Sequence, residues 1–132
     1  MTLAKDIMTT ELILAHPEMT VEEAIKTLVN NRITGMPVVD NEKRLIGVVS
    51  EYDVIKTVNA QKDDFQLNLA QKIGYSSKVT TVSEDTSLQD ILCLFIEKNI
   101  RRVPVMNKKS ELVGIITRRD IMRILFYRSK SL

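Results

Sequence analysis

The chain contains two copies of a short segment in which a glycine, a hydroxyl side chain and a carboxylate recur at fixed spacing. The segment runs from Gly47 to Asp53 and again from Gly114 to Asp120, with the pattern Gly-hydrophobic-x-Ser/Thr-x-x-Asp. A glycine in a strand lets another group approach the backbone closely. The hydroxyl and the carboxylate then fall at the start of a helix, where free N–H groups and the helix dipole favour a phosphate or a polar sugar. A carboxylate there can accept hydrogen bonds from two neighbouring ribose hydroxyls.

The same residue types also have a purely structural use. Ser50 with Asp53, and Thr117 with Asp120, have the spacing of a helix capping box, which requires no ligand. For a single Ser/Thr-x-x-Asp segment this structural interpretation is the better one. Two copies in register, each with a preceding glycine and an upstream Pro-Val pair, favour ligand binding. Both interpretations stay open at this point.

The two segments belong to an internal repeat of the whole chain. A proline, a glycine and an aspartate of the first copy each recur 67 positions later, as the pairs Pro37/Pro104, Gly47/Gly114 and Asp53/Asp120. Such a repeat indicates a supersecondary unit that cannot bury its apolar face alone. We therefore expect two units that pack together and share a core.

Each copy predicts the element order β-α-β-β-α. Apolar residues at helical spacing predict a first helix, from Val21 in one copy and from Leu88 in the other, each preceded by a capping signal. Two β-branched runs joined by a polar turn predict a hairpin, and a second helix begins near Glu51 and near Arg118. The strands are expected at residues 12–15, 36–39 and 45–49, and at residues 79–82, 103–106 and 112–116.

The expected domain limits follow from this pattern. Motif 1 covers residues 1–58 and motif 2 covers residues 73–128, with a short tail at 129–132. Between the motifs, residues 59–72 form a linker that begins polar and then carries Phe65 and Leu69 at helical spacing, which predicts a loop leading into a short helix.

Composition excludes several classes of protein. The chain has 132 residues, of which 44% are hydrophobic, and a formal net charge of +2, which argues against broad nucleic-acid or membrane binding. A single cysteine, Cys93, and a single histidine, His16, exclude a disulfide framework and make a zinc site or a histidine-centred catalytic network a poor interpretation. Because Lys5 and Asp6 precede any apolar segment, no signal peptide is expected, and we predict a cytoplasmic protein.

At this point the chain resembles the tandem cystathionine β-synthase (CBS) domain pair, also called a Bateman module, from Ala4 to about Leu125. The resemblance is carried by Asp6–Thr9, Thr20–Ala24, Gly35–Asp40 and Leu45–Ser50, with their second-half counterparts. It implies an α/β fold of two β-α-β-β-α motifs related by pseudo-two-fold symmetry and packed through their sheets. It also implies two related clefts, in which many members bind AMP, ADP, ATP or S-adenosylmethionine.

The resemblance further implies which residues line each cleft. Asp53 and Asp120 would each hold a ribose, with Ser50 and Thr117 near the ribose or the phosphate. The Asp53 cleft would be completed by Tyr75, Val79, Thr80, Arg101, Arg102 and Pro104, and the Asp120 cleft by Met8, Leu12, Ile13, Thr34, Met36 and Pro37.

The two clefts differ in charge. Arg101 and Arg102 stand where the first repeat has Thr34 and Gly35, and guanidinium groups match paired phosphate oxygens well. A phosphorylated ligand is therefore favoured at Asp53. Arg118 and Arg119 lie at the start of the helix that carries Asp120, so the Asp120 cleft could also bind a phosphorylated ligand. The alternative for all four arginines is that they lie on a solvated surface and bind no ligand.

The sequence thus predicts a regulatory CBS pair that binds an adenine nucleotide or S-adenosylmethionine and acts as an energy or metabolite sensor, with no catalytic residues, required cofactor or metal. The resemblance implies a homodimer held through the second helices, with Val54, Ile55, Val58, Ile121, Met122 and Leu125 as candidates for helix packing. One alternative is a ligand-free structural or protein-interaction module. Another is a nucleic-acid-binding regulator that uses Arg118, Arg119, Arg123 and Arg128, against which the small net charge argues.

Overall fold

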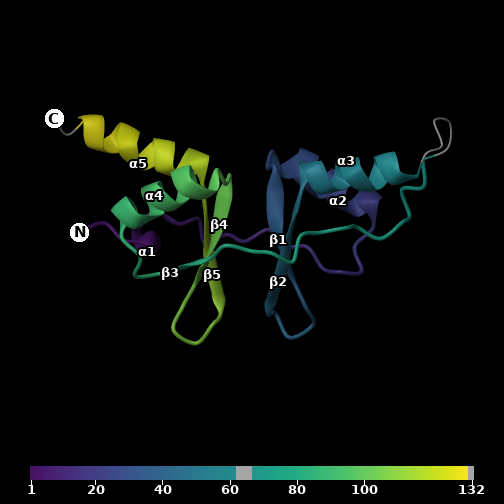
Figure 1. The fold of residues 1–132 in the computed structure, drawn as a ribbon, viewed down its shortest axis with the longest axis horizontal. Helices are drawn as coiled ribbons and strands as arrows, with labels where there is room; N and C mark the ends of the chain where they lie inside the picture. The colour runs from purple at the N-terminus through teal and green to yellow at the C-terminus, as the bar shows by residue number, and fades with distance from the viewer. Residues whose placement is uncertain (62–66, 131–132) are drawn as a thin grey trace. The chain divides into compact units, whose positions relative to one another are not determined.

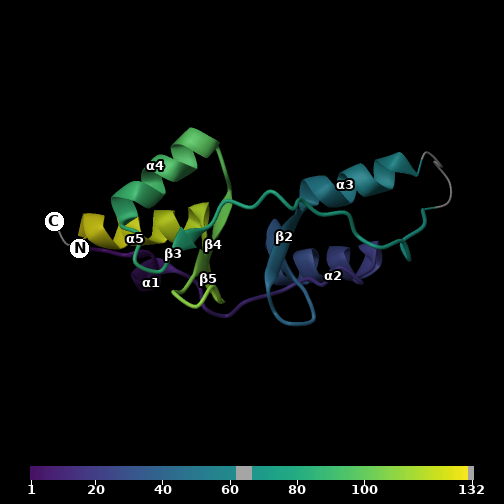
Figure 2. The same ribbon diagram turned by 60° about the horizontal axis from the view of Figure 1, so that its bottom comes forward.

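The computed structural model describes residues 1–61 and 67–130, and the chain divides into two compact units. Unit 1 consists of Met1–Leu12 and Thr80–Leu132, and unit 2 of Ile13–Val79. In each unit, two long helices lie on the same side of an antiparallel hairpin (Figures 1 and 2). The helices are α1 (Ala4–Ile7), α2 (Val21–Asn31), α3 (Glu51–Ala60), α4 (Leu88–Lys98) and α5 (Arg118–Lys130), and the strands are β1 (Gly35–Val39), β2 (Leu45–Ser50), β3 (Val82–Ser83), β4 (Arg102–Met106) and β5 (Leu112–Thr117). The mixed α/β fold with two repeated motifs is confirmed.

Unit 2 is built on the β1–β2 hairpin. The two strands pair antiparallel, with Gly35 opposite Ser50 and Val38 opposite Gly47. Ala15 runs parallel to β1 and makes an isolated bridge to Val38. Helices α2 and α3 turn their apolar residues toward the hairpin, which removes these side chains from water. The buried core consists of Ala15, Val21, Ala24, Leu28, Met36, Val38, Val49, Val54 and Ile73.

Unit 1 repeats this arrangement. Strands β4 and β5 pair with Arg102 opposite Thr117, and Val105 opposite Gly114. The short strand β3 runs parallel to β4, with Val82 opposite Val105. Its core consists of Ala4, Val82, Ile91, Phe95, Val103, Val105, Ile116 and Ile121.

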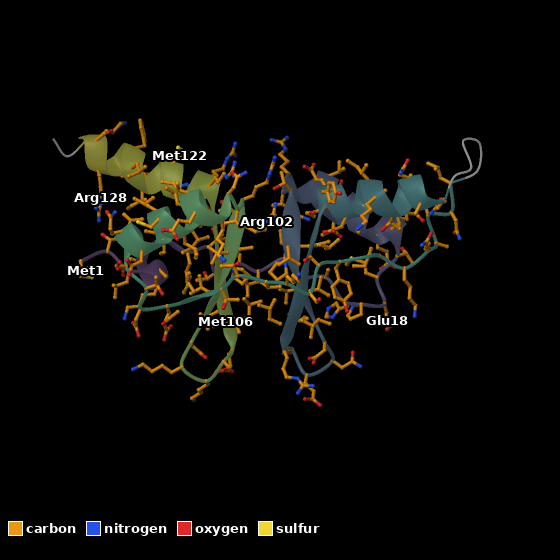
Figure 3. The ribbon with its side chains drawn as sticks, in the orientation of Figure 1. Met1, Glu18, Arg102, Met106, Met122 and Arg128 are labelled. Atoms are coloured by element: carbon orange, nitrogen blue, oxygen red, sulfur yellow. The ribbon has the colours of Figure 1, made fainter. Side chains whose placement is uncertain are left out.

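The first residues of the chain pack with its second half. The N–H of Ala4 donates to the carbonyl of Thr86 over 2.8 Å, and the N–H of Leu88 donates to the carbonyl of Thr2 over 2.9 Å. Arg128 extends from α5 toward the N-terminal segment and donates to the Thr2 hydroxyl (Figure 3). The N-terminal segment is therefore a structural part of unit 1.

The early segment of the second repeat packs in turn with the hairpin of the first repeat. Ser76 pairs antiparallel with Val48 of β2, just as Thr9 pairs with Ile115 of β5. These two pairings are again 67 positions apart along the chain. The packing units therefore cut across the sequence repeat, and the limits 1–58 and 73–128 stay a prediction from the sequence.

Polar side chains cap the starts of α2 and α4, as the sequence predicts. The N–H of Glu23 donates to the hydroxyl of Thr20 over 3.2 Å, and the Glu23 carboxylate accepts from the N–H of Thr20. Ser87 caps α4 by accepting a 3.2 Å hydrogen bond from the N–H three residues further on. The residues that follow α2 and α4, Arg32 (φ 54°) and Asn99 (φ 50°), adopt the left-handed conformation.

In both hairpin turns a side-chain oxygen accepts hydrogen bonds from backbone N–H groups, but the side chain is charged in the first turn and neutral in the second. The Asp40 carboxylate accepts from the N–H groups of Glu42 and Arg44, each over 2.9 Å, and from the Arg44 guanidinium. The Arg44 N–H, with the guanidinium and the Glu42 N–H, holds the pKa of Asp40 below its ordinary value despite some desolvation. In the second hairpin the neutral Asn107 side chain accepts from the N–H of Glu111 over 2.9 Å.

The early strands are shorter than the sequence predicts. Residues 12–15 contribute one bridge at Ala15, and residues 79–82 end in the two-residue strand β3. In both segments the chain turns at once toward the next helix. The turn is closed by the N–H of Met19 donating to the His16 carbonyl, and by the N–H of Thr86 donating to the Ser83 carbonyl.

The linker also differs from the prediction. Residues 67–72 form turns and no helix. The Gln61 side chain donates to the Asn68 carbonyl over 2.9 Å and accepts from the Asn68 N–H over 2.8 Å. These bonds occupy backbone groups that a helix would need. Phe65, on which the helical spacing partly depended, lies outside the described residues.

Candidate functional site

The first Ser-x-x-Asp segment joins β2 to α3 in unit 2. Ser50 is the N-cap of α3, and its hydroxyl accepts from the N–H of Asp53 over 3.3 Å. In return, Oδ2 of Asp53 accepts from the Ser50 N–H over 2.8 Å and from the Ser50 hydroxyl over 2.9 Å. The Asp53 side chain is half-buried, and its Oδ1 has no hydrogen-bond partner among the residues that the structure describes. One oxygen therefore serves the helix cap and the other is uncommitted.

The second segment joins β5 to α5 in unit 1 and is more enclosed. Oδ2 of Asp120 accepts from the Thr117 N–H over 2.8 Å and from the Thr117 hydroxyl over 3.1 Å. Oδ1 accepts from the Thr9 hydroxyl over 3.0 Å and from the Arg123 guanidinium over 3.1 Å. Asp120 is only 4% exposed. Both of its oxygens are therefore used within unit 1.

The two glycines are needed because the chain itself lies against them. A Cβ at Gly47 would lie 2.5 Å from the Tyr75 ring and 2.6 Å from the Ser76 carbonyl oxygen. A Cβ at Gly114 would lie 2.4 Å from the Met8 sulfur. The close approach expected from the sequence is thus made by the early segment of the other repeat.

Part of each predicted cleft belongs to a single unit. Unit 2 holds Ser50 and Asp53 with Tyr75 and Val79, and unit 1 holds Thr117 and Asp120 with Met8 and Leu12. The other residues of each predicted cleft belong to the opposite unit, and the complete clefts stay predictions. For the Asp53 cleft these are Thr80, Arg101, Arg102 and Pro104, and for the Asp120 cleft Ile13, Thr34, Met36 and Pro37.

Burial limits what some of these residues can offer. Met36 is fully buried in the core of unit 2, and Pro37 and Pro104 are also fully buried. Thr34 is exposed, whereas Val79 is half-buried.

Three exposed arginines of unit 1 differ in their partners. Arg118 donates to the Ile100 carbonyl over 2.9 Å and to the Asn99 side chain over 3.2 Å, so its guanidinium closes the end of α4. Arg101 and Arg119 are exposed and have no ion pair among the described residues. These two, rather than Arg118, have the free cationic group that a phosphate requires.

Two residues of the Asp120 network were not among the predicted site residues. Thr9 and Arg123 both donate to Oδ1 of Asp120. The sequence held a signal for Arg123, which lies one helical turn after Asp120, but none for Thr9, whose partner is 111 positions away.

Among the described residues, no group of three or more His, Cys, Asp or Glu side chains could hold a metal ion. None of the helices in residues 1–61 and 67–130 has the length and hydropathy needed to cross a membrane.

Comparison with protein families identifies the class. The model of the CBS domain matches the chain twice, at residues 4–60 and 71–127. The chain therefore belongs to the CBS domain family and carries the domain as a tandem pair.

Individual relatives extend this assignment. The chain is 33% identical to the chloroplastic CBS domain-containing protein CBSX1 of Arabidopsis thaliana, over 92% of this chain and 62% of that protein. It is 31% identical to an inosine-5'-monophosphate dehydrogenase of Methanocaldococcus jannaschii, over 91% of this chain and 23% of that enzyme. The chain thus spans less than two thirds of either protein.

Two solved structures are similar in fold and carry ligands. The CBS domain pair of protein MJ0100, in complex with 5'-methylthioadenosine and S-adenosyl-L-methionine, has a TM-score of 0.78 and 29% identity over 94% of this chain and 99% of that one. The structure of CBSX2 in complex with AMP has a TM-score of 0.78 and 29% identity over 98% of this chain and 99% of that one. The Arabidopsis thaliana CBSX2 sequence is also a relative of this chain.

Proposed function

We propose that this CBS pair binds an adenosine-containing ligand of the AMP, ADP, ATP or S-adenosylmethionine class and acts as a sensor of it. The observation that carries the proposal is the Asp53 carboxylate. Its Oδ2 is fixed by Ser50, while its Oδ1 has no partner among the described residues. Two related CBS pairs hold adenosine compounds, AMP in one and methylthioadenosine with S-adenosylmethionine in the other.

The chemistry of the carboxylate fits a ribose. An ionised carboxylate oxygen offers two acceptor positions, so Oδ1 of Asp53 can accept both hydroxyls of one ribose diol. Half-burial makes such bonds stronger than they are in water. In this proposal Ser50 lies near the ribose or phosphate, and Tyr75 and Val79 lie near the adenine.

The proposal includes a second copy of the chain. Val54 and Ile121 are buried in the cores of their units, whereas Ile55 and Met122 at the next positions are 67% and 59% exposed. Leu125 is 41% exposed. A homodimer would cover these side chains, and Met122→Glu should then give a monomer by light scattering. Lys109→Glu in the β4–β5 turn is the control that should stay dimeric.

A ligand-free structural module is the second candidate. It is supported by the capping boxes, because Asp53 and Asp120 each already accept from the N-cap residue of a helix. In that case substitution of either aspartate would lower stability without changing any affinity.

Calorimetric titration separates the two candidates. We would titrate the full chain with AMP, ATP and S-adenosylmethionine, with CMP as the control for the base. Saturable heat with an adenosine compound, weakened at least ~10-fold with CMP, is the expected result. If all adenosine compounds give neither heat nor thermal stabilisation, the sensor proposal is wrong and the structural module replaces it.

A further inference from the structure

The two repeats differ in how they treat their aspartates, and the difference can be followed residue by residue. Each aspartate follows a strand with which an early segment pairs, through Thr9 in unit 1 and through Ser76 in unit 2. Thr9 and Ser76 occupy equivalent positions, 67 residues apart. Both carry a hydroxyl, so the two sites begin with the same chemistry.

The hydroxyls are used differently. In unit 1 the Thr9 hydroxyl donates to Oδ1 of Asp120 over 3.0 Å. In unit 2 the Ser76 hydroxyl donates instead to the Lys78 carbonyl, over a long 3.5 Å. No hydrogen bond joins Ser76 to Asp53 among the described residues.

The basic residue one turn along the helix differs in the same direction. Arg123 donates from α5 to Oδ1 of Asp120 over 3.1 Å. Lys56 is the equivalent residue of α3, and it forms no ion pair with Asp53 among the residues that the structure describes. The planar guanidinium is pre-organised to bind a carboxylate, so arginine loses less side-chain entropy per hydrogen bond than the flexible lysine does.

The count of acceptor positions then separates the sites. An ionised carboxylate has about four lone-pair positions. Asp120 fills them with the Thr117 N–H, the Thr117 hydroxyl, Thr9 and Arg123. Asp53 fills only those that receive the Ser50 N–H and hydroxyl. A ribose diol brings two hydroxyl donors, which matches the positions left at Asp53 and none at Asp120.

We infer that Thr9 and Arg123 occupy the Asp120 carboxylate and so keep a ribose from binding there. Each chain then binds one adenosine-type ligand, at Asp53. This inference rests on the proposed function. To enter at Asp120, a ribose has to displace both donors, and it thereby breaks a contact between the N-terminal segment and α5. Asp120 is a structural residue and Asp53 a ligand-binding one, although both stand in the same motif.

The number of sites tests the inference. Calorimetry with AMP is expected to give one site per chain in the wild-type protein. Asp53→Asn should weaken AMP binding at least ~10-fold, whereas Asp120→Asn should change it less than ~3-fold. Two equivalent sites in the wild type, or loss of binding in Asp120→Asn alone, overturns the inference.

A second set of variants keeps the test independent of the stability of Asp120→Asn. The double variant Thr9→Val with Arg123→Gln frees Oδ1 of Asp120 and is expected to give a second site for AMP. The control carries the equivalent changes in the first repeat, Ser76→Ala with Lys56→Gln, and should keep one site. A single AMP site in both double variants would show that Thr9 and Arg123 are not what prevents binding at Asp120, and would overturn the inference.

The proposed function fails in a different way. If the wild-type chain binds none of AMP, ATP or S-adenosylmethionine, the proposed function is wrong and the number of sites has no meaning. If it binds AMP at two sites, the proposed function stands and only the inference fails.

Discussion

Replacement of Thr9 by valine removes one hydroxyl and keeps the shape of the side chain. The hydroxyl donates over 3.0 Å to Oδ1 of Asp120, a carboxylate that is only 4% exposed. A hydrogen bond to a charged group contributes about 1.5–3 kcal/mol. Because Arg123 still donates to the same oxygen, the lower end applies. We expect Thr9→Val to lower the free energy of unfolding by about 1.5 kcal/mol.

The assay is urea unfolding followed by circular dichroism, with amide hydrogen exchange to locate the effect. The N–H of Ile115 donates to the Thr9 carbonyl over 3.0 Å and should exchange about tenfold faster in Thr9→Val. Ser76→Ala is the matched control, since its hydroxyl makes only an exposed 3.5 Å contact and should cost less than about 0.5 kcal/mol. Equal losses in the two variants would refute the reasoning, because the Asp120 network would then contribute nothing that the Asp53 site lacks.

Three further predictions concern the scaffold. Gly47→Ala should lower the free energy of unfolding by about 1–3 kcal/mol in urea unfolding, and Gly114→Ala should lower it by less. The new Cβ meets a backbone carbonyl oxygen at 2.6 Å in the first variant and only a flexible methionine side chain in the second. A larger loss in Gly114→Ala than in Gly47→Ala would contradict this packing. Arg32→Gly should raise the melting temperature, since it relieves about 1–2 kcal/mol of left-handed strain and costs about 0.5–1 kcal/mol of unfolded-chain entropy. Asn99→Gly should not raise the melting temperature, because asparagine tolerates the left-handed conformation and the variant loses the hydrogen bond from Arg118 to the Asn99 side chain. Equal gains in melting temperature in the two variants would be evidence against strain at Arg32. Because the pKa of Asp40 is lowered on folding, its contribution to stability is fully present above its ordinary value of 3.8 and is lost as the pH falls through the folded value; an NMR titration of its carboxyl carbon should show a midpoint below 3.8, and a midpoint above it contradicts the turn geometry.

Local signals in the sequence were sufficient for most elements. Apolar spacing and a capping pair predict α2, and the capping box at Thr20 is present with the expected reciprocal bonds. The hairpins follow from β-branched runs, and their ends agree with β1, β2, β4 and β5 to within one residue. The repeat gave the correspondence between the halves, since equivalent residues pair in both hairpins.

Contacts between distant segments could not be predicted in the same way. The N-terminal segment packs with the second half, and its Thr9 donates to a carboxylate 111 positions away. Nothing in the local pattern at Thr9 indicates that partner. The motif Ser/Thr-x-x-Asp predicts a capping box at both sites, but whether Oδ1 is free depends on the segment that crosses over.

The early strands and the linker show the other limit. A β-branched run at residues 79–82 predicts a strand, yet the turn closed at Ser83 leaves only Val82–Ser83 paired. In the linker, the side chain of Gln61 bonds the backbone of Asn68 and so replaces the helix that apolar spacing favours.

The Asp53 carboxylate is proposed to bind a ribose diol. The most direct measurement compares the affinities of AMP and 2′-deoxy-AMP for the wild-type chain and for Asp53→Asn. Removal of the 2′-hydroxyl should weaken binding about tenfold in the wild type, because one charged hydrogen bond is lost, and less than about threefold in Asp53→Asn. An equal loss in both proteins, or no loss in the wild type, would contradict the claim that Asp53 binds the ribose.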